Sequence, residues 1–559
     1  MKLIIKEYLS LLKESNELDA LIPELLLSMK HKVISKAQIG VRQYGVDIAS
    51  VGIDKDGIEK VFLFTVKEGD IDRKDWDGGS EQAVRPSLED IRETYISSHL
   101  EEQYQKYPKK IILATGGDLK QTIQLKWSQY TDKYSIENLL EYAFWGGDEL
   151  AILIEEHLFN EHMIPQKIRS KFRKTLALLN DTDYDLRDYY NFLKYILEDE
   201  KLATLSPKKQ LKALRLIYLA LNIIYSWSKE ENNLKPALLA SERTVLNVWD
   251  YLYKNNLTNK KNLTDVVGKI YFKHINIVSE YCEKLAPAMR IKDGLSMYGH
   301  HFIQESKILF EQAGILAELG HLCYFTGFQN ENKEYLNYSQ HIASLLKTYI
   351  QNHKAMYNPV YDEHIIDISL AILLLNLWNE IDFIDEWISN LISHIQFAYN
   401  AQGKYFPIDS DNFDELVELN LKDGANKEEY IKTSTMLPIL AQWCISLGLI
   451  ESYKFIYHVS TEIYEKSTLQ IWYPDVDIEK FMYISNAAFK CGYAEAPITI
   501  HEHPKDFAKL MEEIHDSDNF IDIKNLSSIR HGLFPLILIS NRHFRMPVFP
   551  QLWNMKVIK

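Results

Sequence analysis

Three side chains that can do chemistry lie close together early in the chain: Asp47, Thr65 and Lys67. Asp47 opens one apolar run, and Thr65 and Lys67 close the next. A lysine at the end of an apolar strand, beside a carboxylate, is costly to bury unless the charges pair or bind something. The pattern therefore indicates either an ordinary cross-strand ion pair or a functional site.

A hairpin must position these residues. Both runs are rich in β-branched and aromatic residues, and the Asp-Gly pair between them is a strong hairpin signal, so we predict two antiparallel strands. Pairing outward from the turn places Asp47 roughly opposite Lys67. Because side chains alternate along a strand, Thr65 and Lys67 share one face while Val66 takes the other.

The hairpin resembles a known active-site motif. Gly45-Val46-Asp47, followed by a strand ending Thr65-Val66-Lys67, is similar to the PD-(D/E)XK nuclease superfamily, particularly its Mrr-like restriction endonuclease branch. In that family the first Asp holds a divalent metal, the second strand carries Glu-x-Lys or Gln-x-Lys, and a preceding helix contributes another acid. Residues 18–29 resemble that helix, which places Asp19 at the position of its acid.

The resemblance implies a catalytic set of Asp47, Thr65, Lys67 and Asp19, and a Mg²⁺ or Mn²⁺ ion held by Asp47, the Val66 carbonyl and Asp19. The metal polarises the phosphate and lowers the pKa of a bound water, while Lys67 orients that water and offsets charge on the phosphate. Thr65 departs from the usual Glu or Gln, and Asp19 is one methylene shorter than Glu. Since a hydroxyl can coordinate a hard cation directly or through water, we interpret the site as a variant active site.

Residues 1–160 alternate strand and helix patterns, and the resemblance covers nearly all of them. We therefore expect an α/β restriction-endonuclease-like domain with a central mixed sheet flanked by helices. Further strands are predicted at 32–38, 110–115 and 140–145, and helices at 3–30 (broken near 16), 86–107, 119–130 and after 146. Gly116-Gly117 lacks the spacing of a phosphate-binding loop, so we predict a turn there.

Several polar residues are candidates for nucleic-acid contact. In nucleases of this branch the helix after the hairpin packs beside the metal site, so the resemblance makes Gln82 and Arg85 candidates for phosphate contact; an exposed helix start explains them equally well. The run 167–174 is strongly basic and can grip a DNA backbone or form a solvated helix face. Its candidates are Lys167, Arg169, Lys171 and Arg173. A second basic cluster consists of Lys208, Lys209, Lys212 and Arg215.

Beyond about residue 165 the chain is almost continuously helical in period. We expect an α-helical sensor or oligomerisation domain at 161–510, built either as stacked helical hairpins or irregularly, because no repeat period can be fixed. Residues 511–559 are predicted to be a C-terminal capping segment, with a partner-docking strip as the alternative. The adjacent His300 and His301 lack a histidine at i+4, and together with His364 we interpret them as ordinary core or surface residues.

Composition limits the function classes. A net charge of −15 over 559 residues argues against a protein that coats nucleic acid non-specifically, although a local basic groove remains compatible. The four cysteines form no C-x-x-C pair, and no signal peptide is recognised, which fits a reducing cytoplasm. The longest apolar segment, 368–378, is too short to span a bilayer and predicts a buried helix rather than a membrane protein.

We therefore expect a metal-dependent DNA endonuclease, an effector of bacterial anti-phage defence that is regulated by its helical domain or by a companion ATPase or sensor protein. Homo-oligomerisation is compatible with double-strand cleavage. The alternative is a nuclease-fold protein that has lost its metal and acts as a nucleic-acid-binding or scaffolding subunit of a defence complex. Thr65 is the residue that keeps this alternative open.

Overall fold

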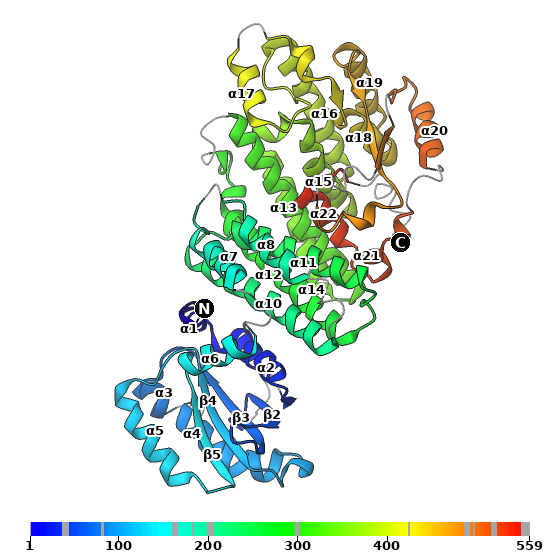
Figure 1. Cartoon of the computed structure of the whole chain (residues 1–559). Coiled ribbons are helices and arrows are strands. Elements are labelled where there is room, and N and C mark those ends of the chain that lie inside the picture. Colours follow the sequence, from blue (N-terminus) through cyan, green and yellow to red (C-terminus); the bar gives the residue numbers. More distant parts are fainter. Residues whose placement is uncertain are drawn as a thin grey trace. The chain divides into compact units, whose positions relative to one another are not determined.

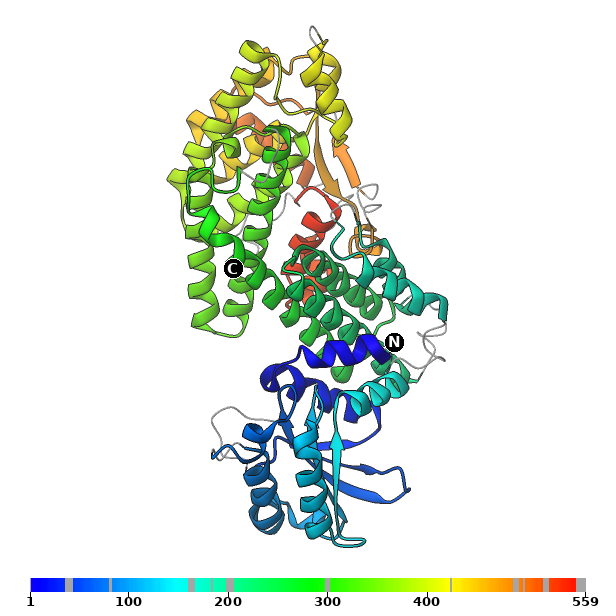
Figure 2. The same ribbon diagram turned by 90° about the vertical axis from the view of Figure 1, so that its left-hand side faces the viewer.

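The structure is a computed structural model that describes the chain with several gaps. The described residues are 2–35, 44–79, 83–158, 166–181, 184–197, 206–296, 302–422, 425–485, 492–495, 498–515 and 522–548. The chain forms two compact units, one made of residues 1–240 and 259–266, the other of 241–258 and 267–559 (Figures 1 and 2). The pattern change near residue 160 therefore lies inside the first unit, which also includes the first helices of the helical region.

The first unit combines a sheet with helices; η denotes a short 3₁₀-helical or π-helical segment. Its elements are α1 (Lys2–Ser10), η1 (Glu14–Leu18), α2 (Asp19–Ser28), β1 (Lys32–Ser35), β2 (Ile48–Ile53), β3 (Glu59–Lys67), α3 (Arg73–Asp77), α4 (Val84–Asp90), η2 (Ile91–His99), η3 (Glu102–Tyr104), β4 (Lys109–Thr115), α5 (Gln121–Tyr134), β5 (Leu140–Trp145), α6 (Gly147–His157), α7 (Gln166–Ala177), α8 (Arg187–Leu197) and α10 (Pro207–Glu230).

The five strands form one mixed sheet in the order β1-β2-β3-β4-β5. The pairs β1–β2 and β2–β3 are antiparallel, while β3–β4 and β4–β5 are parallel. This confirms the predicted mixed sheet with flanking helices followed by a large helical region. The central strand β3 is apolar on both faces, as expected for a strand covered on both sides.

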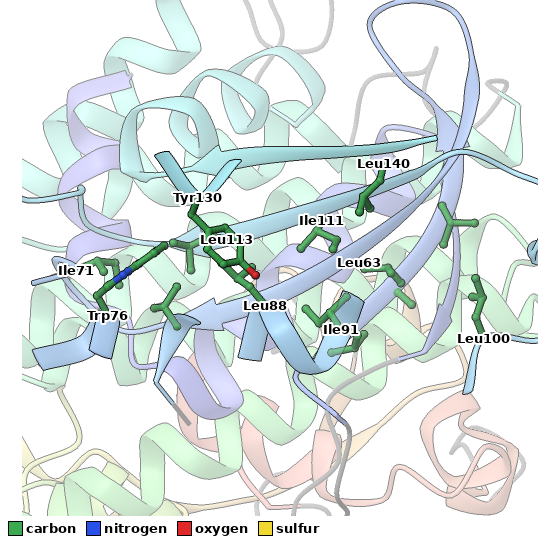
Figure 3. Packing of buried hydrophobic residues seen from close by; sticks show 14 of the residues in the cluster. Leu63, Ile71, Trp76, Leu88, Ile91, Leu100, Ile111, Leu113, Tyr130 and Leu140 are labelled. Atoms are coloured by element: carbon green, nitrogen blue, oxygen red, sulfur yellow. The ribbon is translucent and has the colours of Figure 1, made fainter. Parts of the chain in front are cut away.

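The two faces of β3 contact different side chains. Val61 and Leu63 belong to a buried cluster with residues of α3, α4, α5 and β4, among them Trp76 and Leu113 (Figure 3). On the opposite face, the ring of Phe64 lies 5.1 Å from the ring of Trp145. Side chains two residues apart share one face of a strand, so Thr65 and Lys67 lie on the same face as Leu63, that of the buried cluster. They are at the carboxyl end of the strand.

The helix predicted at 86–107 is wrong at its end. The α4 helix continues as the π-helical segment η2 and stops at His99. Leu100 then turns to an extended conformation (φ −73°, ψ 124°), and its N–H donates to the Tyr95 carbonyl. Its side chain is buried in the core cluster, so burial of Leu100 ends the helix before the chain enters β4. The strand predicted at 32–38 is described only as far as Ser35.

The second unit is mainly helical. Its elements, of which the first two cross the boundary between units, are α11 (Lys235–Lys254), α12 (Lys261–Met289), α13 (Phe302–Gln329), α14 (Lys333–Asn352), η5 (Lys354–Tyr357), η6 (Asp362–His364), α15 (Ile365–Leu377), α16 (Ile381–Phe397), η7 (Ala398–Gln402), α17 (Phe413–Leu421), η8 (Lys427–Tyr430), β6 (Thr433–Ser434), α18 (Met436–Leu447), α19 (Ile450–Glu462), β7 (Thr468–Leu469), β8 (Ile471–Pro474), η9 (Ile478–Lys480), β9 (Gly492–Glu495), α20 (Pro504–His515), η11 (Ile523–Asn525), α21 (Ser527–Arg530) and α22 (Pro535–Phe544). Within the described ranges, no helix has the length and apolar character needed to cross a membrane.

The last described segment lies inside the second unit. Helix α22, drawn in red in Figures 1 and 2, packs against α13 and α15. Its Arg542 is buried and pairs with Glu318 of α13 at 2.5 Å and with Glu242 of α11. Arg545 follows the helix and pairs with Asp367 at 2.9 Å. The basic residues of this segment therefore neutralise buried acids of the helical array.

Candidate active site

The hairpin register determines which residues meet. Ile48 pairs with Phe64, so the next position outward places Asp47 beside Thr65, and the Asp47 N–H donates to the Phe64 carbonyl at 2.8 Å. The prediction that Asp47 lies opposite Lys67 is therefore wrong by two residues. The loop closed by the Asp54 N–H and the Ile58 carbonyl, at 2.9 Å, sets this register. A shift of two residues preserves the face, so Asp47, Thr65 and Lys67 still share one side of the sheet.

The Asp47 carboxylate is partly buried and oriented by the backbone. Its Oδ2 accepts a hydrogen bond from the Val66 N–H at 2.7 Å, whereas Oδ1 accepts none from the described residues. Burial raises the pKa of Asp47 to about 6, against the Val66 hydrogen bond and the charge of Lys67, which both lower it. The negative charges of Glu14 and Asp19 raise it further. Such a carboxylate favours the approach of a cation.

Lys67 and Thr65 differ in their access to solvent. Thr65 is only 1% exposed, whereas the Lys67 side chain is 15% exposed and its Nζ lies 3.5 Å from Glu14 Oε1. Glu14 belongs to η1, and it was not a candidate from the sequence. It lies far from the strand motif, and no residue spacing links it to Lys67. The nearest feature of the sequence pattern is the break in the helix near residue 16.

Asp19 begins α2, the helix that the resemblance assigned to the active site. Its charge contributes to the raised pKa of Asp47, so the structure brings it within electrostatic reach of that carboxylate. The four predicted catalytic residues, Asp47, Thr65, Lys67 and Asp19, therefore lie in one region of the first unit. Val66 contributes through its backbone, and its side chain is buried on the other face of the sheet.

Gly45, two residues before Asp47, lies directly against α4. Its φ of +78° is in the left-handed region, which glycine adopts without strain. A Cβ atom at this position would lie 2.3 Å from the Ser87 carbonyl oxygen. The close approach leaves no room for a side chain, so glycine here allows α4 to pack beside the chain that leads to Asp47.

The structure describes one of the two candidates for phosphate contact after the hairpin. Gln82 lies outside the described residues. Arg85 is exposed at the start of α4, where its Nε lies 3.0 Å from Glu89 and its guanidinium 3.5 Å from Asp77. Two carboxylates thus already neutralise much of its charge, which favours the exposed helix start over a phosphate site.

The basic run 167–174 forms the amphipathic helix α7. Its apolar side is buried through Ile168, Phe172 and Leu176. On the polar side, Lys171 and Lys174 lie 3.6 and 3.2 Å from Asp188 of α8. Arg173 is exposed and Arg169 is partly buried, while the Lys167 side chain lies outside the described part of the helix. Of the second cluster, Arg215 pairs with Glu24 of α2 at 2.9 Å, which leaves Lys208 and Lys209 as its exposed members.

The donor set fits a hydrated cation. In the part of the chain that the structure describes, no three His, Cys, Asp or Glu side chains are grouped to hold one metal ion. Mg²⁺ binds proteins through one or two carboxylates and keeps several waters, and Asp47 is a carboxylate with one oxygen that accepts no hydrogen bond from the described residues. His300 and His301 lie outside the described residues, and His364 is a core residue whose ring stacks on Phe310 at 4.4 Å.

Comparisons of the chain with protein-family models, with curated proteins and with solved structures found no match.

Proposed function

We propose that the chain is a metal-dependent DNA endonuclease that hydrolyses phosphodiester bonds. The observation that carries the proposal is the placement of Asp47 and Lys67 on one face of two adjacent strands, with the Asp47 carboxylate held by the Val66 N–H at 2.7 Å. Asp47, Asp19 and the Val66 carbonyl would hold Mg²⁺ or Mn²⁺. When bound, the metal polarises the phosphate and lowers the pKa of a bound water.

The protein's own residues supply orientation and charge. Lys67 reaches solvent beside Asp47, so its ammonium can offset charge that builds on the phosphate oxygens. The Val66 N–H holds one carboxylate oxygen of Asp47, and the other, which accepts no hydrogen bond from the described residues, could bind a cation. Because the pKa of Asp47 is about 6, protons compete with the cation below that pH, and activity falls on the acid side.

We place this activity in bacterial anti-phage defence, as an effector that its helical unit or a companion ATPase or sensor protein controls. Support for control comes from the architecture, because helix arrays such as α11 to α16 present large surfaces to partners. Homo-oligomerisation would bring two active sites to one duplex.

Plasmid cleavage tests the proposal. Supercoiled DNA is incubated with wild type, Asp47→Ala and Lys67→Ala in Mg²⁺ or Mn²⁺, with EDTA as the metal-free reference. We expect metal-dependent nicking that each substitution lowers at least about 100-fold. Asp132→Ala and Lys133→Ala on α5 are matched controls, since both residues are exposed, and they should cleave like wild type. Equal cleavage by all variants would show a contaminating nuclease.

The second candidate is a scaffolding subunit of a defence complex that binds nucleic acid without cutting it. The buried, uncharged Thr65 at the position of the family's strand acid favours this candidate. Calorimetry with Mn²⁺ separates the two. A folded wild type that neither cleaves DNA nor binds Mn²⁺ supports the scaffold, whereas Mn²⁺ binding lost in Asp47→Ala supports an active site that requires an activator.

A further inference from the structure

The charge of Lys67 needs a partner that the strand itself does not supply. Thr65, its neighbour on the same face, carries no charge, and the Asp47 carboxylate is hydrogen-bonded to the Val66 N–H. Among the described residues, the carboxylate within ion-pair distance of Lys67 Nζ is that of Glu14, at 3.5 Å. An acid from the region between α1 and α2 therefore stands beside the lysine of β3.

The backbone around Glu14 is held in place. Glu14 opens the π-helical segment η1, and its carbonyl accepts the Asp19 N–H. An overlapping turn that starts one residue earlier is closed by the Leu18 N–H, which donates to the Lys13 carbonyl at 3.0 Å. The Lys13 N–H in turn donates to Glu17 Oε2 at 2.8 Å. Short π-helical segments cost stability and recur at functional sites. This one fixes the backbone of Glu14 and Asp19 together.

The ion pair contributes little to the fold. The Glu14 side chain is 42% exposed, and ion pairs this accessible to solvent add little to the stability of a protein. Its effect is on the charges of the site, because Glu14 interacts with Lys67 directly and with Asp47 through space. A solvent-open carboxylate can also be displaced from Lys67 by a phosphate oxygen.

We propose that Glu14 is a positioning residue that holds the Lys67 ammonium at the opening of the active site until substrate phosphate replaces it. This inference rests on the proposed nuclease function, and it needs a test with a readout that does not depend on cleavage.

Covalent labelling of lysines supplies that readout. Wild type, Glu14→Gln and Glu17→Gln are treated with limiting amine-reactive reagent, and the modification of each lysine is measured by mass spectrometry, with exposed Lys133 as internal reference. We expect labelling of Lys67 to rise about two- to fivefold in Glu14→Gln, the range set by an exposed pair. Glu17→Gln is the matched control, because Glu17 bonds the Lys13 N–H, and it should leave Lys67 unchanged.

Kinetics complete the test. In Glu14→Gln we expect kcat to fall about tenfold or more because the ammonium is misplaced, while KM stays the same or falls. Unchanged Lys67 labelling, or an unchanged kcat in an active protein, overturns the inference. If Lys67 labelling rises in Glu14→Gln while the wild type does not cleave DNA, the pairing of Glu14 with Lys67 stands and the proposed nuclease function is not supported.

Discussion

At the scale of single residues, Asp47 has an environment that differs from that of an ordinary exposed carboxylate. Its ionisation is opposed by burial and by two neighbouring acids, and Lys67 and the Val66 N–H compensate only in part. A group with a raised pKa in the folded state destabilises the fold once the pH exceeds its unfolded value. Asp47 therefore lowers the stability of the protein at neutral pH, as expected where function and stability conflict.

The substitution Asp47→Asn removes this cost. Because the folded pKa is about 6 and the ordinary value is 3.8, the free energy of unfolding of the variant should exceed that of wild type by up to about 3 kcal/mol above pH 6. The difference should shrink as the pH falls from 6 to 4 and vanish below that. Urea denaturation at several pH values measures it. A variant that is less stable than wild type at pH 7.5 would contradict the assigned environment of Asp47.

At the scale of elements, α4 lies close to the chain that leads to Asp47 and β2, and Gly45 permits this approach. The substitution Gly45→Ala combines a strained φ of +78° with a Cβ atom 2.3 Å from the Ser87 carbonyl oxygen. We expect a loss of about 2–4 kcal/mol in the free energy of unfolding, and weaker cleavage, because the backbone must move.

Gly57→Ala is the control for this substitution. Gly57 has a similar φ of +81° in the hairpin turn, but a Cβ atom added there would have no neighbouring heavy atom within 4 Å. The free energy of unfolding of Gly57→Ala should therefore fall only by the backbone strain, about 1 kcal/mol. Chemical denaturation of both variants therefore separates strain from steric contact. Equal losses of stability in the two variants would show that the backbone of α4 at Ser87 moves at little cost to admit the added Cβ atom.

At the scale of the whole molecule, the first unit contains the candidate chemistry, and the second is a helical array that its own C-terminal segment holds together. Arg542 and Arg545 lie at the end of α22 and pair with acids from four other helical elements, α11, α13, η6 and α15, among them Glu318 and Asp367. Burial raises the pKa of Asp367 to about 6 even though Arg545 lowers it. Removal of Arg545 is costly because it leaves the charge of the buried Asp367 uncompensated.

The substitution Arg545→Met should therefore lower the free energy of unfolding of the second unit by about 1–3 kcal/mol at pH 8, less than for a fully buried pair because the Arg545 side chain is 36% exposed. At pH 5 the loss should be smaller, because Asp367 can then take up a proton and become neutral. Arg530→Met, at an exposed position of α21, is the control and should change stability little at either pH. Thermal unfolding at the two pH values checks the prediction, and a loss independent of pH would contradict it.

The sequence by itself determined the local elements and the faces of the strands. β-Branched runs around an Asp-Gly turn form a hairpin, and the two-residue alternation places Asp47, Thr65 and Lys67 on one face in any register shifted by an even number of residues. The continuous apolar character of β3 likewise indicates a strand covered on both sides. These properties depend on neighbours in the chain, so local patterns contain them.

Only the tertiary structure decided which distant residues meet. The register of Asp47 against Thr65 depends on the hydrogen bonding of the loop, and Leu100 ends its helix because the core buries it. Glu14 reaches Lys67 because η1 packs beside β3. Contacts of this kind arise from the packing of elements far apart in sequence, and the identities of adjacent residues do not specify them.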